Sequence, residues 1–150
     1  MAASAWLVWP EAIANGHSDP EYNRLLHGQA IPNFQDANWA DWRMFMEDYE
    51  DVLRGLGCGA LLAYTTDGLP DEKIEWVSPE AMSAAADRLA DLIRQQEPAV
   101  EELVAQYQDW SNRGGKPIAE QLVDDLAAVK RWAHWAQSLG KTQVAFELEV

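Results

Sequence analysis

Three consecutive segments with helical periodicity fill residues 78–140, and they constrain the fold more than any other feature of the chain. The first begins at Ser78-Pro79-Glu80. A hydroxyl cap, a proline at the first helical position and an acidic residue together favour the start of a helix. Its apolar residues then recur every three or four positions: Met82, Ala85, Leu89, Leu92 and Ile93. This spacing predicts a helix with one buried face.

The two segments that follow repeat this pattern, and each begins at a proline. The segment from Pro98 carries Val100, Leu103, Val104, Tyr107 and Trp110 and is expected to end at Gly114-Gly115. The segment from Pro117 is the longest and carries Leu122, Leu126, Val129, Ala133 and Ala136 on one face. Its apolar face is widened by Trp132, Trp135 and Leu139, which predicts burial on two sides, and Gly140 suits its C-terminal cap.

Strand patterns lie on both sides of these helices. Residues 5–9 (AWLVW) form an apolar run that stops at Pro10, and residues 60–66 (ALLAYTT) are typical of a central strand. Residues 73–77 (KIEWV) follow a turn at residues 67–70 and are expected to return as the second arm of an antiparallel hairpin. Residues 142–150 alternate strictly between apolar and other side chains, which predicts a strand covered on one face only.

A further helix is expected after Asn38, which can cap it. Its apolar face would contain Trp42, Phe45, Tyr49, Val52 and Leu56, and it would end at Gly55, Gly57 and Gly59. Together these segments predict an α+β fold over residues 1–150 as a single domain. In this fold, a small three- or four-stranded, mainly antiparallel sheet has about four helices packed on one face.

The chain is strongly acidic, with 25 acidic and 11 basic residues and a net charge of −14. This field repels phosphate backbones and anionic lipid, which disfavours binding to nucleic acid or to a membrane, and it attracts a basic protein. The alternative interpretation is that the acidity only keeps the protein soluble. No apolar run has the length of a membrane span, and residues 1–10 lack the basic start of a signal peptide, so we expect a cytoplasmic protein.

The only cysteine, Cys58, excludes an internal disulfide and a cysteine-based zinc site. It follows the expected C-terminal end of a helix, where the partial negative charge raises a thiol pKa, so we expect a small buried residue and not a nucleophile. The histidines and acids at His17, Asp19, Glu21 and His27 match no known ligand spacing. We therefore predict no metal and no cofactor.

The acidic run at residues 47–51 is the first candidate for a binding surface. On a helix, Glu47 shares a side with Glu50 and Asp51, and Arg54 stands at the spacing that pairs with Glu50 or Asp51. A solvated helix face explains such a run, but it also suits a contact strip for a basic partner. In the second interpretation, Trp39 at the helix start anchors the contact.

The eight tryptophans are the second candidate. Most of them are expected to fill the core, while the alternative is an aromatic pocket for a cationic ligand, lined by Trp42 and closed by a loop with His17 and His27. His134 is expected to be an ordinary surface histidine.

No catalytic constellation is present in the sequence, so a non-catalytic protein is the leading expectation. We predict a small acidic cytosolic interaction protein that binds a basic protein partner, in the manner of inhibitors and immunity proteins, through Trp39, Glu47, Glu50 and Asp51. The alternative is a small-molecule binding protein or enzyme with a Trp-lined acidic pocket. The sequence leaves the oligomeric state open.

Overall fold

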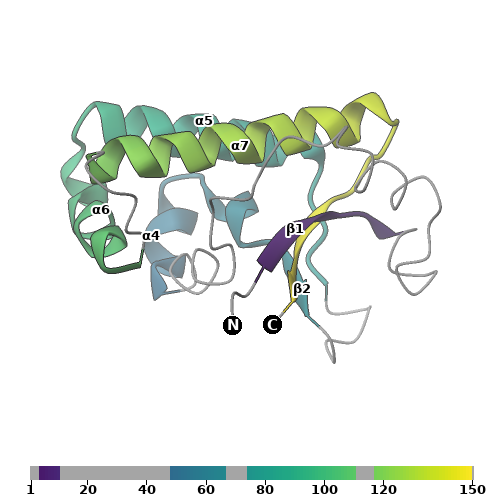
Figure 1. Cartoon of the computed structure of the whole chain (residues 1–150), viewed down its shortest axis with the longest axis horizontal. Helices are drawn as coiled ribbons and strands as arrows, with labels where there is room; N and C mark the ends of the chain where they lie inside the picture. The colour runs from purple at the N-terminus through teal and green to yellow at the C-terminus, as the bar shows by residue number, and fades with distance from the viewer. Residues whose placement is uncertain (1–3, 11–47, 67–73, 111–116, 150) are drawn as a thin grey trace.

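The computed structural model describes residues 4–10, 48–66, 74–110 and 117–149, and helices make up most of this part of the chain (Figure 1). Its α-helices are α4 (Glu50–Gly55), α5 (Pro79–Arg94), α6 (Pro98–Trp110) and α7 (Ile118–Ser138). A 3₁₀ helix, η1, spans Gly59–Leu62. The strands are β1 (Ser4–Val8), β2 (Tyr64–Thr66) and β3 (Ala145–Glu149).

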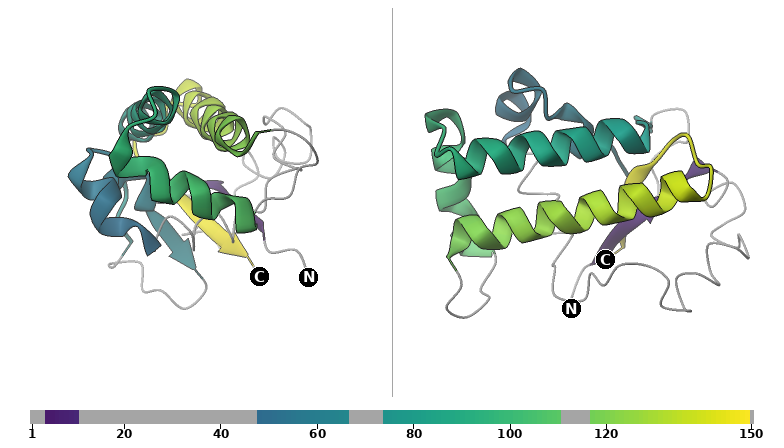
Figure 2. Two further views of the ribbon diagram at one scale, coloured as in Figure 1. Left: turned by 90° about the vertical axis from the view of Figure 1, so that its left-hand side faces the viewer. Right: turned by 90° about the horizontal axis from the view of Figure 1, so that it is seen from above.

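The two longest helices, α5 and α7, run antiparallel side by side and form one layer of the molecule (Figures 1 and 2). The expected apolar faces meet here and are buried, which confirms the helical pattern of residues 78–140: Met82, Ala85, Leu89 and Ile93 from α5, and Leu122, Leu126, Val129, Ala133 and Ala136 from α7. Trp132 and Ala128 are buried as well, so α7 is covered on more than one side, as predicted. At the surface, Lys130 joins the two helices through a 2.9 Å ion pair with Asp87.

Two predicted helix ends are confirmed in atomic detail. The side chain of Ser78 accepts a 3.0 Å hydrogen bond from the backbone N–H of Ala81, which caps α5. Gly140 ends α7 with a φ of 76°, a left-handed conformation that glycine adopts without steric cost.

The strands form a small sheet in the order β1-β3-β2. β3 lies in the middle, antiparallel to β1 and parallel to β2, and Phe146 stands opposite Leu7 on one side and Tyr64 on the other. Val144, Ala145 and Phe146 are all buried. The prediction that residues 142–150 are covered on one face only is therefore wrong here, since the small side chain of Ala145 is buried on the second face.

The predicted fold class, an α+β domain organised around a mainly antiparallel sheet, is wrong. The described residues are mostly helical, and the strands contain only five, three and five residues with one antiparallel and one parallel pairing. The helices also do not share one face of the sheet. α6 lies at the end of the α5–α7 layer that is far from the strands (Figures 1 and 2).

Residues 60–66 differ from the predicted central strand. The run begins in η1, and only its last three residues form β2, at an edge of the sheet. The buried residues of this run are Leu61, Leu62 and Ala63. An apolar run of this kind therefore indicates that the segment is buried, but it does not distinguish a helical turn from a strand. The predicted hairpin is wrong too. Within the described residues, Val77 bridges to Val144 and β2 pairs with β3.

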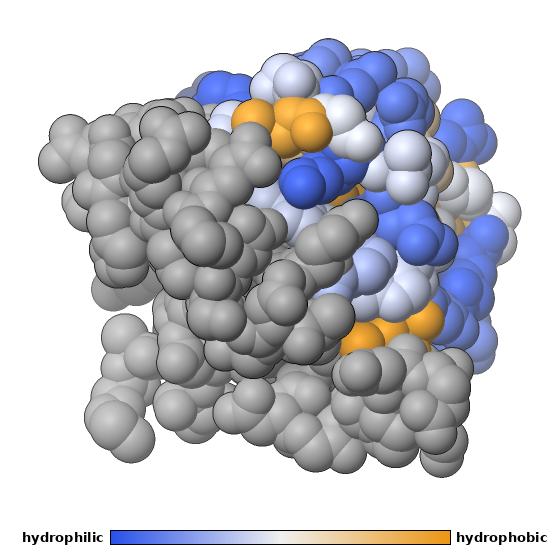
Figure 3. Space-filling view, turned by 90° about the vertical axis from the view of Figure 1, so that its right-hand side faces the viewer, coloured by the Kyte–Doolittle hydropathy of each residue, from blue (hydrophilic) through white to orange (hydrophobic). Residues whose placement is uncertain are grey.

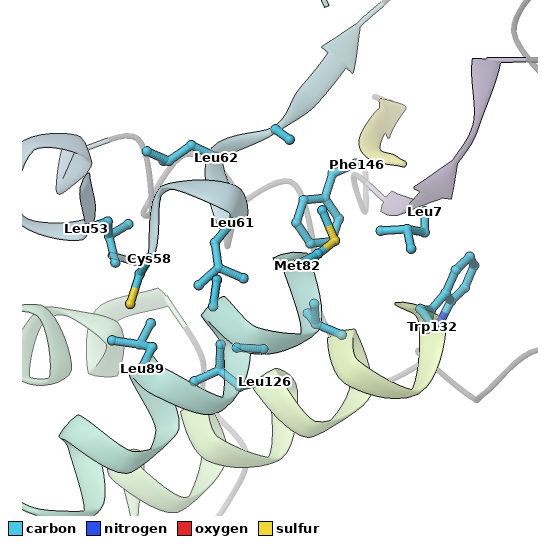
Figure 4. Close-up of a cluster of buried hydrophobic side chains, with 14 of the residues drawn as sticks. Leu7, Leu53, Cys58, Leu61, Leu62, Met82, Leu89, Leu126, Trp132 and Phe146 are labelled. Carbon is cyan, nitrogen blue, oxygen red and sulfur yellow. The ribbon is translucent and has the colours of Figure 1, made fainter. Parts of the chain in front are cut away.

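The core lies between the α5–α7 layer and the elements packed beneath it (Figure 4). Leu53 of α4, Cys58 and Leu61 gather against Leu89 of α5, so α4 and η1 are held by the same cluster. Next to them, Met82 approaches Phe146 of β3, which joins the sheet to this cluster.

Candidate partner-binding surface

α4 and α6 lie at one end of the molecule, the left-hand side of Figure 1, which faces the viewer in the left panel of Figure 2. Both helices, and the residues just before α4, carry exposed carboxylates. We call them the acidic surface: Asp48, Glu50, Asp51, Glu101 and Glu102, all of which are exposed. This surface includes two of the residues that the sequence predicts for partner binding, Glu50 and Asp51.

Both helices are amphipathic: each buries its apolar side chains and exposes its acidic ones. Leu53 is fully buried beneath α4, and Val100 and Leu103 are buried beneath α6, so the carboxylates are left on the solvent sides. Glu50 and Asp51 lie in the first turn of α4 and Glu101 in that of α6. Carboxylates at a helix N-terminus interact favourably with the helix dipole, so each helix tolerates its own acidic residues.

Tyr49 connects the two helices electrostatically. Its half-buried phenol has a pKa above the usual tyrosine value, because burial disfavours the phenolate and the negative charges of Glu102 and Asp48 oppose it further. A carboxylate of α6 therefore acts on the side chain that precedes α4.

Arg54 offsets part of this charge. Its guanidinium lies 3.0 Å from a carboxylate oxygen of Glu50 and 3.3 Å from one of Glu75. The hydrogen bond to Glu50 is the main cause that raises the Arg54 pKa above its ordinary value. The predicted pairing of Arg54 within the acidic run is thus confirmed for Glu50, and Glu50 carries less free charge than Asp51 does.

Behind the acidic surface, Arg88 of α5 closes the end of α4. Its guanidinium donates a hydrogen bond to the carbonyl oxygen of Leu56. The positive charge also interacts favourably with the partial negative charge at this C-terminal end of the helix. Cys58 lies just beyond and is fully buried. Burial raises the pKa of its thiol more than the charge of Arg88 lowers it, so the prediction of a small buried residue is confirmed.

Three tryptophans form a group between the end of β1 and the C-terminal part of α7. The ring of Trp135 lies 5.2 Å from that of Trp9 and 5.6 Å from that of Trp132, centre to centre. Trp9 and Trp132 are buried. The ammonium of Lys141 stands 5.1 Å from the centre of the Trp9 ring, so this chain supplies its own cation to the group.

The remaining predicted site residues lie outside the described part of the chain. These are Trp39 and Glu47 of the partner-binding strip, and Trp42, His17 and His27 of the alternative ligand pocket. The structure therefore brings together only Glu50 and Asp51 of the predicted set. His134 is exposed, as expected.

The sequence reasoning missed Glu101 and Glu102. Their exposure follows from the spacing of Val100 and Leu103, so the sequence already indicates two carboxylates on the outer side of this helix. The approach of Glu102 to Tyr49 depends on how α6 packs against α5 and α7, and no local pattern in the sequence encodes that packing.

Comparisons of the chain with protein-family models, with curated proteins and with solved structures find no match. No described helix combines the length and the apolar character that crossing a bilayer requires. Among residues 4–10, 48–66, 74–110 and 117–149, no three histidine, cysteine or acidic side chains are grouped as metal ligands. Figure 3 shows the end of the molecule opposite the acidic surface, where the described residues are largely hydrophilic and apolar ones form small separate groups.

Proposed function

We propose that this protein is a non-catalytic binding module whose acidic surface docks a basic protein partner, in the manner of an inhibitor or immunity protein. The observation that carries the proposal is that α4 and α6, which lie at the same end of the molecule, both carry exposed carboxylates. A protein partner is favoured over nucleic acid or anionic lipid, because this charge repels both. The proposed compartment is the cytoplasm, where Cys58 would remain a thiol.

The distribution of charge supports this proposal beyond the net value. On α7, the first half carries Glu120, Asp124 and Asp125, whereas Lys130 and Arg131 lie in the second half. Within α7, the half that begins next to α6 is therefore more negative than the half that leads to β3. Such an asymmetric field orients an approaching basic protein as well as attracting it.

The alternative is a tryptophan-lined pocket for a cationic ligand, and the described aromatic group gives it no support. The buried ring of Trp9 already faces the ammonium of Lys141. A guest cation would have to displace a side chain of the protein itself. Trp42, His17 and His27, on which this alternative depends, lie outside the described residues.

The proposal is tested with the tagged full chain as bait in a lysate of the native host, at low and at high salt. Asp51→Asn combined with Glu102→Gln removes two negative charges from the acidic surface. The matched control, Gln137→Lys with Thr142→Lys, makes the same change in net charge at exposed positions near the C-terminal end of α7, away from the acidic surface. We expect wild type and control to retain the same basic protein at low salt, and the acidic-surface variant to lose it.

With the retained protein in hand, association rates separate steering from general charge. The acidic-surface variant should associate about 5-fold more slowly at low salt, and the control should stay close to wild type. Equal slowing by both variants would show that only net charge matters. Retention that is unaffected by salt and by both variants, or no specific protein on a folded bait, would contradict the proposal.

A further inference from the structure

A groove of about 610 Å³ lies between the end of α5 and the start of α7. Its apolar lining comes from Ile93, Pro117, Ala119 and Val123. Ile93 is buried, and Ala119 and Val123 are half-buried, so the groove has an apolar floor that belongs to the edge of the core. The groove lies beside the turn that leads into α6, at the same end of the molecule as the acidic surface.

Among the described residues that line the groove, two side chains are acidic and one is basic. Glu120 and Asp124 lie four residues apart on α7 and are both exposed, so their carboxylates share one side of the groove. The positive side chain, Arg94, already forms a 3.2 Å ion pair with Asp91. An anion entering the groove would face two carboxylates, whereas a cation would be attracted by them.

Gln96 is the fourth polar side chain of the groove, and its backbone is unusual. Its N–H donates to the carbonyl of Ile93, and the next N–H, that of Glu97, donates to Leu92, the pattern of a Schellman helix end. The same pattern ends α4 at Gly57 and α7 at Gly140. The residue in the left-handed conformation is glycine at those two ends, but here it is glutamine, with a φ of 56°.

A left-handed glutamine lowers stability relative to glycine, and nothing in the helix end itself requires its side chain. Strained residues of this kind are concentrated where a side chain contacts a ligand. The side chain of Gln96 is exposed and lines the groove. The side-chain amide of Gln96, at a position where glycine would be less strained, is therefore best explained by a contact made in the groove.

We infer that this groove receives a lysine- or arginine-bearing segment of the basic partner, an inference that rests on the proposed function. The aliphatic stems of lysine and arginine pack on apolar surface while the charged head remains at a polar edge. In the groove, the stems lie on Ile93 and Val123, and the cations reach the exposed carboxylate of Glu120. The Gln96 amide then supplies a hydrogen bond to the backbone or a polar side chain of the segment.

The test uses the ¹⁵N-labelled full chain and a short amphipathic peptide of lysine and leucine as the probe. A glutamate–leucine peptide of the same pattern and a lysine–serine peptide without apolar residues are the two controls. We expect saturable shifts of the backbone amides of Ile93, Gln96, Ala119 and Val123 with the lysine–leucine peptide. We expect much weaker binding of both controls, since each lacks one of the two matched features.

Two variants examine the residues that the inference names. Glu120→Gln should weaken the lysine–leucine peptide by about 5-fold, the size of one exposed ion pair. Gln96→Gly should raise the unfolding midpoint by about 3 °C, because it relieves the left-handed strain, and should weaken the peptide by about 3-fold. A structural role alone predicts the gain in stability without the loss in binding.

The outcomes distinguish this inference from the proposed function. Shifts confined to amides of α4 and α6 would overturn the groove and leave the acidic surface as the docking site. If the glutamate–leucine peptide bound in the groove more tightly than the lysine–leucine peptide, the groove would not prefer cationic segments, and the inference would be overturned. Shifts in the groove with no capture of a basic protein in the lysate would instead count against the proposed function.

Discussion

At the scale of single residues, the left-handed position at each helix end shows how closely local chemistry and tertiary packing are joined. Gly57 and Gly140 adopt φ values of 79° and 76°. An added Cβ at Gly140 would meet open space, but at Gly57 it would lie 3.3 Å from the Arg88 guanidinium nitrogen that serves α4. Glycine at position 57 therefore avoids the strain of a left-handed side chain and leaves room for Arg88.

We predict that Gly57→Ala destabilises the protein by about 1–2 kcal/mol, because a left-handed alanine is strained and its methyl group displaces Arg88. Gly55→Ala is the matched control. It lies in α4 with nothing within 4 Å of the added Cβ, and should be neutral or stabilising by about 0.5 kcal/mol. Urea denaturation of both variants measures the difference, and equal stabilities would contradict the assignment.

Stability should fall at alkaline pH because of two residues near the acidic surface. Burial raises the thiol pKa of Cys58 above its ordinary value near 9.0, and the phenol pKa of Tyr49 is raised as well. The unfolded chain then loses these protons first, so the free energy of unfolding is unaffected below the ordinary pKa values and decreases above them.

Urea denaturation between about pH 7 and about pH 11 measures this dependence. Cys58→Ala should lower stability at neutral pH, since it leaves a small cavity, and should reduce the decrease that begins near pH 9. Tyr49→Phe should reduce the part that begins about one pH unit higher. An unchanged pH profile in both variants would show that neither group is linked to unfolding.

At the scale of elements, the sequence predicts what local physics determines. Ser78, Pro79 and Gly140 mark helix ends through their own hydrogen bonds or conformations, so the start of α5 and the end of α7 could be read directly. Residues 60–66 could not be assigned correctly, because an apolar run has the same appearance in a buried 3₁₀ turn and in a strand. The parallel pairing of β2 with β3 joins residues about eighty positions apart, which no turn signal reveals.

The α5–α7 contact provides the clearest test of what holds the elements together. Leu126 is 1% exposed in this contact, whereas Lys130 and Asp87 form a partly exposed ion pair across it. Leu126→Ala should cost about 2–5 kcal/mol of unfolding free energy, and Lys130→Gln less than about 1 kcal/mol. The reverse order in thermal or urea denaturation would contradict apolar packing as the main source of stability here.

At the scale of the whole molecule, the candidate surface arises from two helices that the sequence keeps about fifty residues apart. Glu50 and Asp51 were predictable, because a run of acids on one helix is visible as a local pattern. Glu102 was not, since only the packing of α6 brings its charge to Tyr49. The net charge indicates a basic partner, but the position of the surface is a property of the fold.

The most direct test of the central claim is hydrogen–deuterium exchange of this chain, free and bound to the basic protein captured from the lysate. We predict that slowed exchange in the complex covers residues 48–55 and 98–106, the described parts of α4 and α6 that carry the acidic surface. Protection confined to the C-terminal half of α7 and to β3, with α4 and α6 unchanged, would contradict the account.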